Sequence, residues 1–372
     1  MSAYKPPPPH PDARPLLPRT GLRGAYGTYL VDDGLHAAAN VAITLGMPLL
    51  LTGEPGCGKT DFAAVVANAL DPAPEAARPG QDDDAEVRHG LLACHVRTDT
   101  RARDLLYHYD ALLRFGEAQH GDDDARTRAR DPRHYVELQA LGIALTSPHR
   151  RVVLVDEIDK APRDLPNDLL RELDRGDFDI PELAAGRVAG AGEVSDRSGA
   201  VLRRRMRRPE GAPMPVVVVT SNVERQLPDP FLRRCVFFHI DFPDAQRLRE
   251  IVIHRAKRPG AGGAEAPAFD RDQREDTLYL DRLVTIFEHA RRIQGLIKKP
   301  STAELINWVD ALTRAFEPGI ARDEVTRFAQ TLDERGRVVH QSLRWTHLPG
   351  VGCLFKLHED LDSAAAAWTA PA

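Results

Sequence analysis

Cysteine is scarce in this sequence, and so are net charge and long apolar runs. The four cysteines are far apart and show no C-x-x-C spacing (Cys57, Cys94, Cys235 and Cys353). Neither a signal peptide nor a membrane-spanning segment is recognisable, so a reducing cytoplasm is the simplest location and no membrane partner is expected. The 50 lysines and arginines nearly balance the 55 aspartates and glutamates, giving a net charge of −5. This balance gives no overall reason to expect nucleic acid as a partner.

Proline is concentrated at the start of the chain. It occupies positions 6–9, Pro11, Pro15 and Pro18. This density favours polyproline II and cannot support a helix or a core, so we predict a disordered tail over residues 1–21. The tail is either an inert leader or a ligand for an aromatic groove. The length of 372 residues predicts two domains with ample chain for a sizeable core.

A glycine-rich turn stands between an apolar run and a segment of helical character. The run at 48–51 lacks alternation, which indicates a strand buried on both faces, and residues 61–70 are typical of a helix. Glycines allow positive φ, so the turn can direct its N–H groups to an anion at the positive end of the helix dipole. Lys59 then reaches the β- and γ-phosphates of a nucleotide, and the Thr60 hydroxyl can ligate Mg²⁺.

The turn matches the phosphate-loop pattern G-x-x-x-x-G-K-[ST] in full. The alternative interpretation is a purely structural turn. Cys57, beside the helix start, has either a lowered thiol pKa and sensitivity to oxidation or only a small side chain that the turn tolerates. The predicted nucleotide-binding residues here are Gly53, Glu54, Pro55, Gly56, Cys57, Gly58, Lys59, Thr60 and Asp61.

A second informative stretch is Val152–Glu157, an apolar run that ends in two carboxylates. In a parallel sheet the carboxyl end of such a strand faces the ligand crevice, beside the phosphate loop. Asp156 is then placed to hold Mg²⁺, usually through a water, and Glu157 to polarise the water that attacks the γ-phosphate. A strand ending in Asp-Glu is a weak signal alone, and the phosphate loop upstream makes it a strong one.

The alternation of apolar runs and helical segments indicates an α/β fold. Runs at 91–96, 152–155, 214–219 and 235–242 add four buried strands to the one before the phosphate loop, and we assign residues 22–242 to this domain. Beyond Pro243 the segments 245–257, 280–293 and 301–316 are amphipathic, so residues 243–372 are predicted to form a helical domain. Ser301 and Glu304 have the spacing of a capping box.

Two insertions interrupt the α/β domain. Helices are predicted over 104–115 and 135–145, and the highly charged segment 117–133 between them is predicted to be a solvated, mobile loop. The second insertion covers residues 184–210. A segment that begins at 178–181, becomes glycine- and alanine-rich over 184–200 and then carries the arginines of 203–208 is predicted to form a hairpin with a flexible tip. The arginines could contact nucleic acid or an acidic partner. Nucleic acid is the less favoured of the two, since no aromatic residues are interleaved.

The chain resembles the AAA+ ATPases and, within them, the MoxR family. The resemblance covers roughly residues 22–320 and implies a parallel five-stranded sheet of order 5-1-4-3-2 with a C-terminal helical lid. It also implies ATP and Mg²⁺ at each subunit interface of a homo-oligomeric ring, most often of six subunits. The stretches that carry the resemblance are 53–60, 155–160, 167–174, 231–235 and 299–305.

The resemblance also implies roles for individual residues. Asn222 would be the polar sensor that helps to place the attacking water, and Arg234 or Arg233 the finger directed at a neighbour's γ-phosphate. Tyr29, Leu30 and Val31 fall where the family's adenine pocket begins, and residues 105–115 fall near the first central-pore loop. The chain departs from the family at the lid arginine, which aligns near Ala303. Lys298 or Lys299 is the candidate to replace it.

These observations favour an ATP-hydrolysing chaperone whose ring remodels or activates a protein client. In the resembling family the client is often a protein with a von Willebrand factor A domain. One competing hypothesis is a nucleotide-gated DNA-processing motor, which the arginine run favours weakly. Another is a non-hydrolysing nucleotide switch that assembles a signalling or defence complex. Glu157 argues against the switch, because a pure switch gains nothing from a positioned general base.

Overall fold

The computed structural model describes residues 17–18, 23–24, 27–70, 90–184, 193–259, 265–316, 318–330, 332 and 345–366. It divides into two compact units, which we describe separately. The first holds most of the chain up to Ile240, and the second begins at Asp241 and also includes Tyr26–Thr28 and Glu54–Gly58. No helix among the described residues is both long and apolar enough to cross a membrane.

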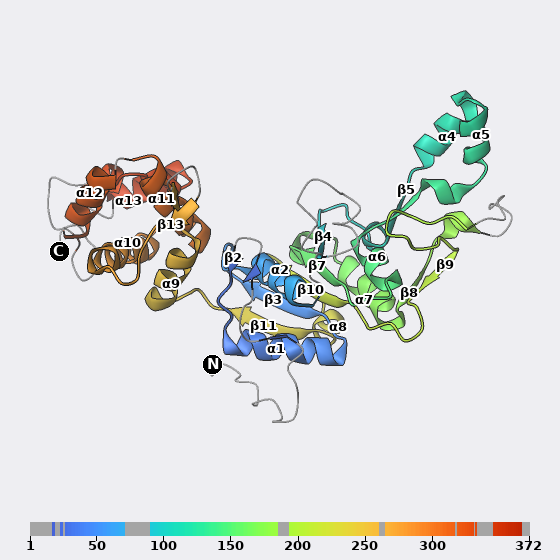
Figure 1. Cartoon of the computed structure of the whole chain (residues 1–372), viewed down its shortest axis with the longest axis horizontal. Helices are drawn as coiled ribbons and strands as arrows, with labels where there is room; N and C mark the ends of the chain where they lie inside the picture. Colours follow the sequence, from blue (N-terminus) through green and yellow to red (C-terminus); the bar gives the residue numbers. More distant parts are fainter. Residues whose placement is uncertain are drawn as a thin grey trace. The chain divides into compact units, whose positions relative to one another are not determined.

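A five-stranded parallel sheet forms the centre of the first unit (Figure 1). Its strands lie in the order β11-β3-β10-β7-β4. Numbered by their order in the chain, these are strands 5-1-4-3-2, so the predicted fold class and strand order are confirmed. The strands are β3 (Leu49–Gly53), β4 (Leu91–His95), β7 (Val152–Asp156), β10 (Val216–Ser221) and β11 (Val236–Ile240).

Helices cover both faces of this sheet, which explains why its central strands are apolar without alternation. Leu154 and Val218 pack on one face with α1 (Asp33–Leu45) and α2 (Lys59–Leu70). Val153 and Val217 pack on the other with α6 (Ala140–Thr146) and α7 (Leu165–Arg175). Successive side chains of a strand point to opposite faces, so only a run that is apolar throughout can fill both layers. The edge strand β4 alternates between buried and more exposed residues, and the edge strand β11 alternates between half-buried and exposed residues.

Leu17 anchors the chain before α1. Leu17 is fully buried, its N–H donates to Asn40 Oδ1 at 3.0 Å, and its carbonyl oxygen lies 2.8 Å from His36 Nε2. The prediction of a disordered tail is therefore wrong at Leu17, because an apolar side chain and two backbone groups are bound by α1. Residues 1–16 and 19–21 of that prediction lie outside the described part of the chain. The short strands β1 (Arg23–Gly24) and β2 (Gly27–Thr28) follow.

The first insertion is an ordered arm and not the predicted solvated loop. Of the two helices predicted beside it, the one over 104–115 forms only from Ala111 and the one over 135–145 only from Ala140. Strands β5 (Tyr107–Tyr109) and β6 (Val136–Leu138) pair antiparallel. The helices α4 (Ala111–His120) and α5 (Asp123–Ala129) lie between them in sequence and project at the end of β5 in Figure 1. Short 3₁₀ turns, η1 (Ala102–Leu105) and η2 (Pro132–Tyr135), flank the arm.

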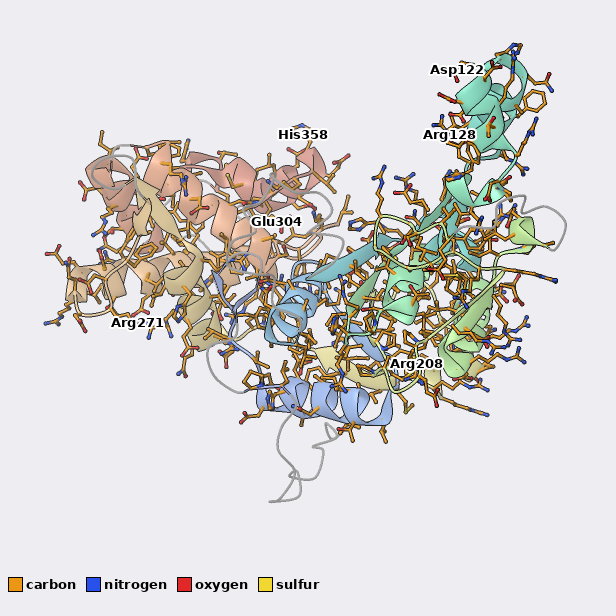
Figure 2. The ribbon with its side chains drawn as sticks, turned by 45° about the vertical axis from the view of Figure 1, so that its right-hand side comes forward. Asp122, Arg128, Arg208, Arg271, Glu304 and His358 are labelled. Carbon is orange, nitrogen blue, oxygen red and sulfur yellow. The ribbon has the colours of Figure 1, made fainter. Side chains whose placement is uncertain are left out.

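Charged residues of the insertion cap and join these helices. Asp110 caps α4 and Asp122 caps α5 through backbone N–H groups. The Arg128 guanidinium lies 2.6 Å from a Glu117 carboxylate oxygen, and Tyr135 donates to the same carboxylate. The hydrogen bonds from Arg128 and Tyr135 lower the pKa of Glu117. The charge run is thus structural, and Figure 2 shows Asp122 and Arg128 together on this arm.

The second insertion contains the predicted hairpin. Strands β8 (Asp177–Asp179) and β9 (Arg205–Arg207) pair antiparallel, and Arg205 lies 2.7 Å from Asp177. The turn η4 (Pro181–Leu183) follows β8, and residues 185–192 of the predicted tip lie outside the described part. Two further short elements border the site described below, η3 (Ile158–Lys160) and α8 (Asp229–Leu232).

Where the structure describes it, the second unit is helical, with one small antiparallel pair of strands. Its core holds the large side chains of Phe287, Trp308, Phe328 and Trp345. Ser301 and Glu304 form the predicted capping box at the start of α11. The elements are α9 (Ala245–Arg255), β12 (Lys257–Pro259), β13 (Glu265–Pro267), α10 (Arg274–Arg292), α11 (Thr302–Arg314), α12 (Pro318–Gln330), η6 (Trp345–His347), η7 (Val351–Cys353) and α13 (His358–Ala366).

Candidate active site

The glycine-rich turn after β3 has the backbone of a phosphate loop. Gly56 and Gly58 adopt φ values of 76° and 94°, a region that favours glycine. Lys59 is the first residue of α2, its side chain is buried, and its ammonium group donates to the Gly53 carbonyl oxygen at 2.9 Å. Asp61 lies in the first turn of the same helix, and Cys57 is buried. A buried ammonium group at a helix start provides positive charge where a phosphate would lie.

Two hydroxyl groups converge on the carboxylate of Asp156 at the end of β7. Thr60 Oγ1 donates to Asp156 Oδ1 at 3.1 Å, and Thr220 Oγ1 donates to the same oxygen at 2.6 Å. His95, at the paired position of β4, has Nδ1 at 3.6 Å from Asp156 Oδ2. A hydroxyl and a carboxylate oxygen this close form a hard oxygen donor set, and this set fits Mg²⁺.

Glu157 is held in an unusual backbone conformation next to Asp156. Its φ of 59° is left-handed, and its N–H donates to Thr220 Oγ1 at 2.9 Å. Its carboxylate accepts from Asn222 Nδ2 at 3.3 Å and from Lys160 Nζ at 2.6 Å. The hydrogen bond to this carboxylate raises the pKa of Lys160. The structure therefore brings the predicted base and the predicted sensor into contact.

Three residues of this cluster have no role in the sequence interpretation. Thr220 joins Asp156 to the backbone of Glu157, Lys160 pairs with the Glu157 carboxylate, and Asp159 accepts from the backbone of Asn222. Their positions in the sequence could have pointed to them, because all three lie inside the stretches that contain Asp156–Glu157 and Thr220–Asn222. Their partners, however, lie up to 65 positions away.

The remaining predicted residues lie apart from this cluster. Tyr29, Leu30 and Val31 precede α1 and are partly buried, with the Tyr29 ring centroid 5.8 Å from that of Phe62. In the helical unit, Lys298 pairs with Glu304 at 3.1 Å, whereas Lys299 is exposed. These placements leave the roles of adenine contact and lid sensor as predictions.

The two candidate finger arginines follow α8 and are exposed. Arg234 Nε lies 3.6 Å from Asp174 Oδ2, and Arg234 Nη1 donates to the Pro230 carbonyl oxygen at 3.4 Å. Among the described residues, neither arginine has a hydrogen bond or ion pair to Asp156 or Glu157. Arg234 instead borders a surface pocket of about 300 Å³, lined by Asn167, Leu170, Arg171, Asp174, Arg175, Pro230 and Arg234.

A comparison with family models gives a match, and it covers most of the residues of this cluster. Residues 48–222 match the model described as the AAA domain of the dynein-related subfamily. The match runs from the strand before the phosphate loop to Asn222, and it supports an AAA-type domain with nucleotide binding as a general property. Tyr29 and Arg234 lie outside the matched residues. No match was found among curated proteins.

Proposed function

We propose that this protein is a MoxR-type AAA+ ATPase that binds ATP with Mg²⁺ and hydrolyses it to ADP and phosphate. The observation that supports this most directly is the contact between Asn222 Nδ2 and the Glu157 carboxylate, 3.3 Å, beside the Asp156 cluster. A carboxylate held by a polar side chain is placed to accept a proton from water and to orient it. Nucleotide binding alone has no use for this arrangement.

The chain's own residues divide the work of hydrolysis. Lys59 and the N–H groups of the phosphate loop bind the phosphates, and Thr60 and Asp156 would hold Mg²⁺. When bound, Mg²⁺ neutralises charge that develops on the phosphate oxygens. Glu157 takes the proton of the attacking water, and Asn222 orients that water and the carboxylate. Lys160 competes for the same carboxylate, so its ion pair must loosen for Glu157 to act as a base.

We extend the proposal to assembly and to a partner. The exposed guanidinium of Arg234 lies 3.6 Å from an exposed carboxylate and donates to a backbone carbonyl oxygen at 3.4 Å, so it can leave these partners at little cost. In a homo-oligomeric ring, proposed to be hexameric, Arg234 or Arg233 would stabilise the transition-state charge in the neighbour's site. The ring would remodel a protein client, for which a von Willebrand factor A domain protein is the first candidate to test.

The catalytic assignment is tested by two substitutions that should differ in nucleotide binding. Lys59→Ala should abolish nucleotide binding, because Lys59 contacts phosphate in the ground state. Glu157→Gln should retain binding and stop turnover, because Glu157 acts on the attacking water. Binding is measured with a fluorescent ATP analogue and turnover by phosphate release, both with and without DNA. An active Glu157→Gln protein would contradict the role of Glu157, and strong stimulation by DNA would favour a DNA-processing motor.

The finger is tested by mixing two inactive proteins. Arg234→Ala should bind ATP and assemble but hydrolyse poorly, since a finger of this kind is worth about 10³ to 10⁵ in rate. Mixing it with Lys59→Ala should restore some activity, because an intact site then meets an intact finger across one interface. If mixed rings form and remain as inactive as their components, Arg234 does not act on a neighbour.

A further inference from the structure

The loop that carries Asn222 is held by side chains through three consecutive backbone N–H groups. The N–H groups of Asn222 and Glu224 both donate to Asp159 Oδ2, at 3.1 and 3.0 Å. The N–H group of Val223 between them donates to Ser221 Oγ at 3.0 Å. Asp159 Oδ2 therefore accepts hydrogen bonds from the residues on both sides of Val223.

Val223 is the strained residue of this loop. Its φ of 62° is left-handed, a region that β-branched residues rarely adopt. The residue is 61% exposed, so packing does little to hold this conformation. The hydrogen bonds on either side of Val223 are the contacts that can hold it. A loop held in a strained backbone conformation is typical of a functional site.

Asp159 is suited to hold the loop because it is buried and rigidly placed. Its side chain is only 3% exposed, and it lies on η3, the turn that directly follows Glu157. The other oxygen, Oδ1, is buried without a hydrogen-bond partner among the described residues, so Asp159 acts on the loop through Oδ2 alone. The same turn thus carries the Glu157 carboxylate and the anchor of Asn222.

We propose that Asp159 is a positioning residue that sets the distance between the Asn222 amide and the Glu157 carboxylate. This inference rests on the proposed function, in which Asn222 orients the attacking water with Glu157. Loss of the Asp159 contacts allows Val223 to relax towards an ordinary backbone conformation and carries the neighbouring amide away from its 3.3 Å contact. Misplacement by about 1 Å of a group that orients a reactant can cost on the order of 10²-fold in rate.

The kinetic test separates positioning from general stability. Asp159→Ala should lower kcat by about 10- to 100-fold with nucleotide affinity nearly unchanged, and Asp159→Asn, which keeps an acceptor oxygen, should lower it less. In an Asn222→Ala background, Asp159→Ala should have little further effect on kcat, because the group that it positions is gone. An equal loss of kcat in both backgrounds would overturn the proposal.

A matched control variant and a second measurement separate the local effect of Asp159 from a general loss of folding. Asp196 also accepts two backbone N–H groups, of Ser198 and Ala200, and Asp196→Asn should leave kcat unchanged. Hydrogen exchange over residues 221–225 should speed up by about 10-fold or more in Asp159→Ala, with exchange in the core of β10 unchanged. Unchanged exchange in that loop would refute the role of Asp159 as its anchor.

Failure of the proposed function has a different signature. If the unaltered protein binds nucleotide but never turns it over, or if Asn222→Ala is fully active, the hydrolytic role of Glu157 and Asn222 is wrong. The positioning role of Asp159 in catalysis is then refuted with it, whereas the anchoring of the loop is still decided by hydrogen exchange. Normal turnover that depends on Asn222 but not on Asp159 refutes the inference alone.

Discussion

Replacing Thr220 with valine should weaken both the fold and the proposed Mg²⁺ site. Thr220 is 1% exposed, and its hydroxyl donates to Asp156 Oδ1 at 2.6 Å while accepting from the Glu157 N–H at 2.9 Å. Valine has nearly the same shape, so the change removes two hydrogen bonds and leaves packing almost intact. It therefore isolates the role of the hydroxyl.

The magnitude follows from the two bonds. A hydrogen bond to a charged group contributes about 1.5–3 kcal/mol, and a buried N–H left without a partner costs about 1–3 kcal/mol. The Asp156 side chain is 15% exposed, so water replaces part of the loss. We expect the free energy of unfolding to fall by about 2–4 kcal/mol. Affinity for Mg²⁺-nucleotide should fall by about 10-fold, because an Asp156 carboxylate that has lost a hydrogen bond is less well placed to hold the metal.

Thr220→Ser is the matched control, because it keeps the hydroxyl and loses one methyl group, at a cost of about 1 kcal/mol. Unfolding is followed by urea titration together with hydrogen exchange in β10, since the chain has two compact units and need not unfold in one step. Nucleotide binding is measured by calorimetry with and without Mg²⁺. If the valine protein is as stable as the serine protein and binds Mg²⁺-nucleotide equally well, the hydroxyl does not organise this site.

Three further predictions concern the surroundings of the site. Leu17→Ala should lower the free energy of unfolding by about 2–5 kcal/mol in a denaturant titration, because the side chain is fully buried, and an unchanged midpoint would contradict the anchor. Gly142→Ala should lower the free energy of unfolding by about 1–3 kcal/mol in the same titration, since a Cβ there would lie 1.9 Å from a backbone carbonyl oxygen. Gly116→Ala is the control and should not lower it, because the space around Gly116 is open. Burial alone would raise the pKa of Asp131, but its hydrogen bonds with Arg133 outweigh this and lower it. The stability that this pair contributes is therefore complete above an unfolded pKa of about 3.9 and is lost as pH falls through the lower folded value. Limited proteolysis of the α4–α5 arm between pH 5 and pH 2 should show this loss. Asp131→Asn should reduce the pH dependence and leave the part that Glu117 contributes.

Local patterns in the sequence determined the architecture around the sheet. The continuous apolar runs at β3, β7 and β10 can only be buried on both faces, so strand, parallel pairing and α/β class follow from composition alone. The phosphate loop is also local, because its glycines and Lys59 are neighbours in sequence. Likewise, the spacing of Ser301 and Glu304 specified a helix start that the structure confirms.

The tertiary structure alone decided which distant residues meet. The strands β5 and β6 are three residues each, too short for a clear periodicity, and pair only because Tyr107 and Leu138 are brought together across the arm. The predicted disorder failed at Leu17 because the binding groups, on His36 and Asn40, belong to a helix further along the chain. The contacts of Asp156 with Thr220 and of Asp159 with Asn222 cross 64 and 63 positions. No local pattern encodes such pairs, since they exist only where parallel strands place their carboxyl ends side by side.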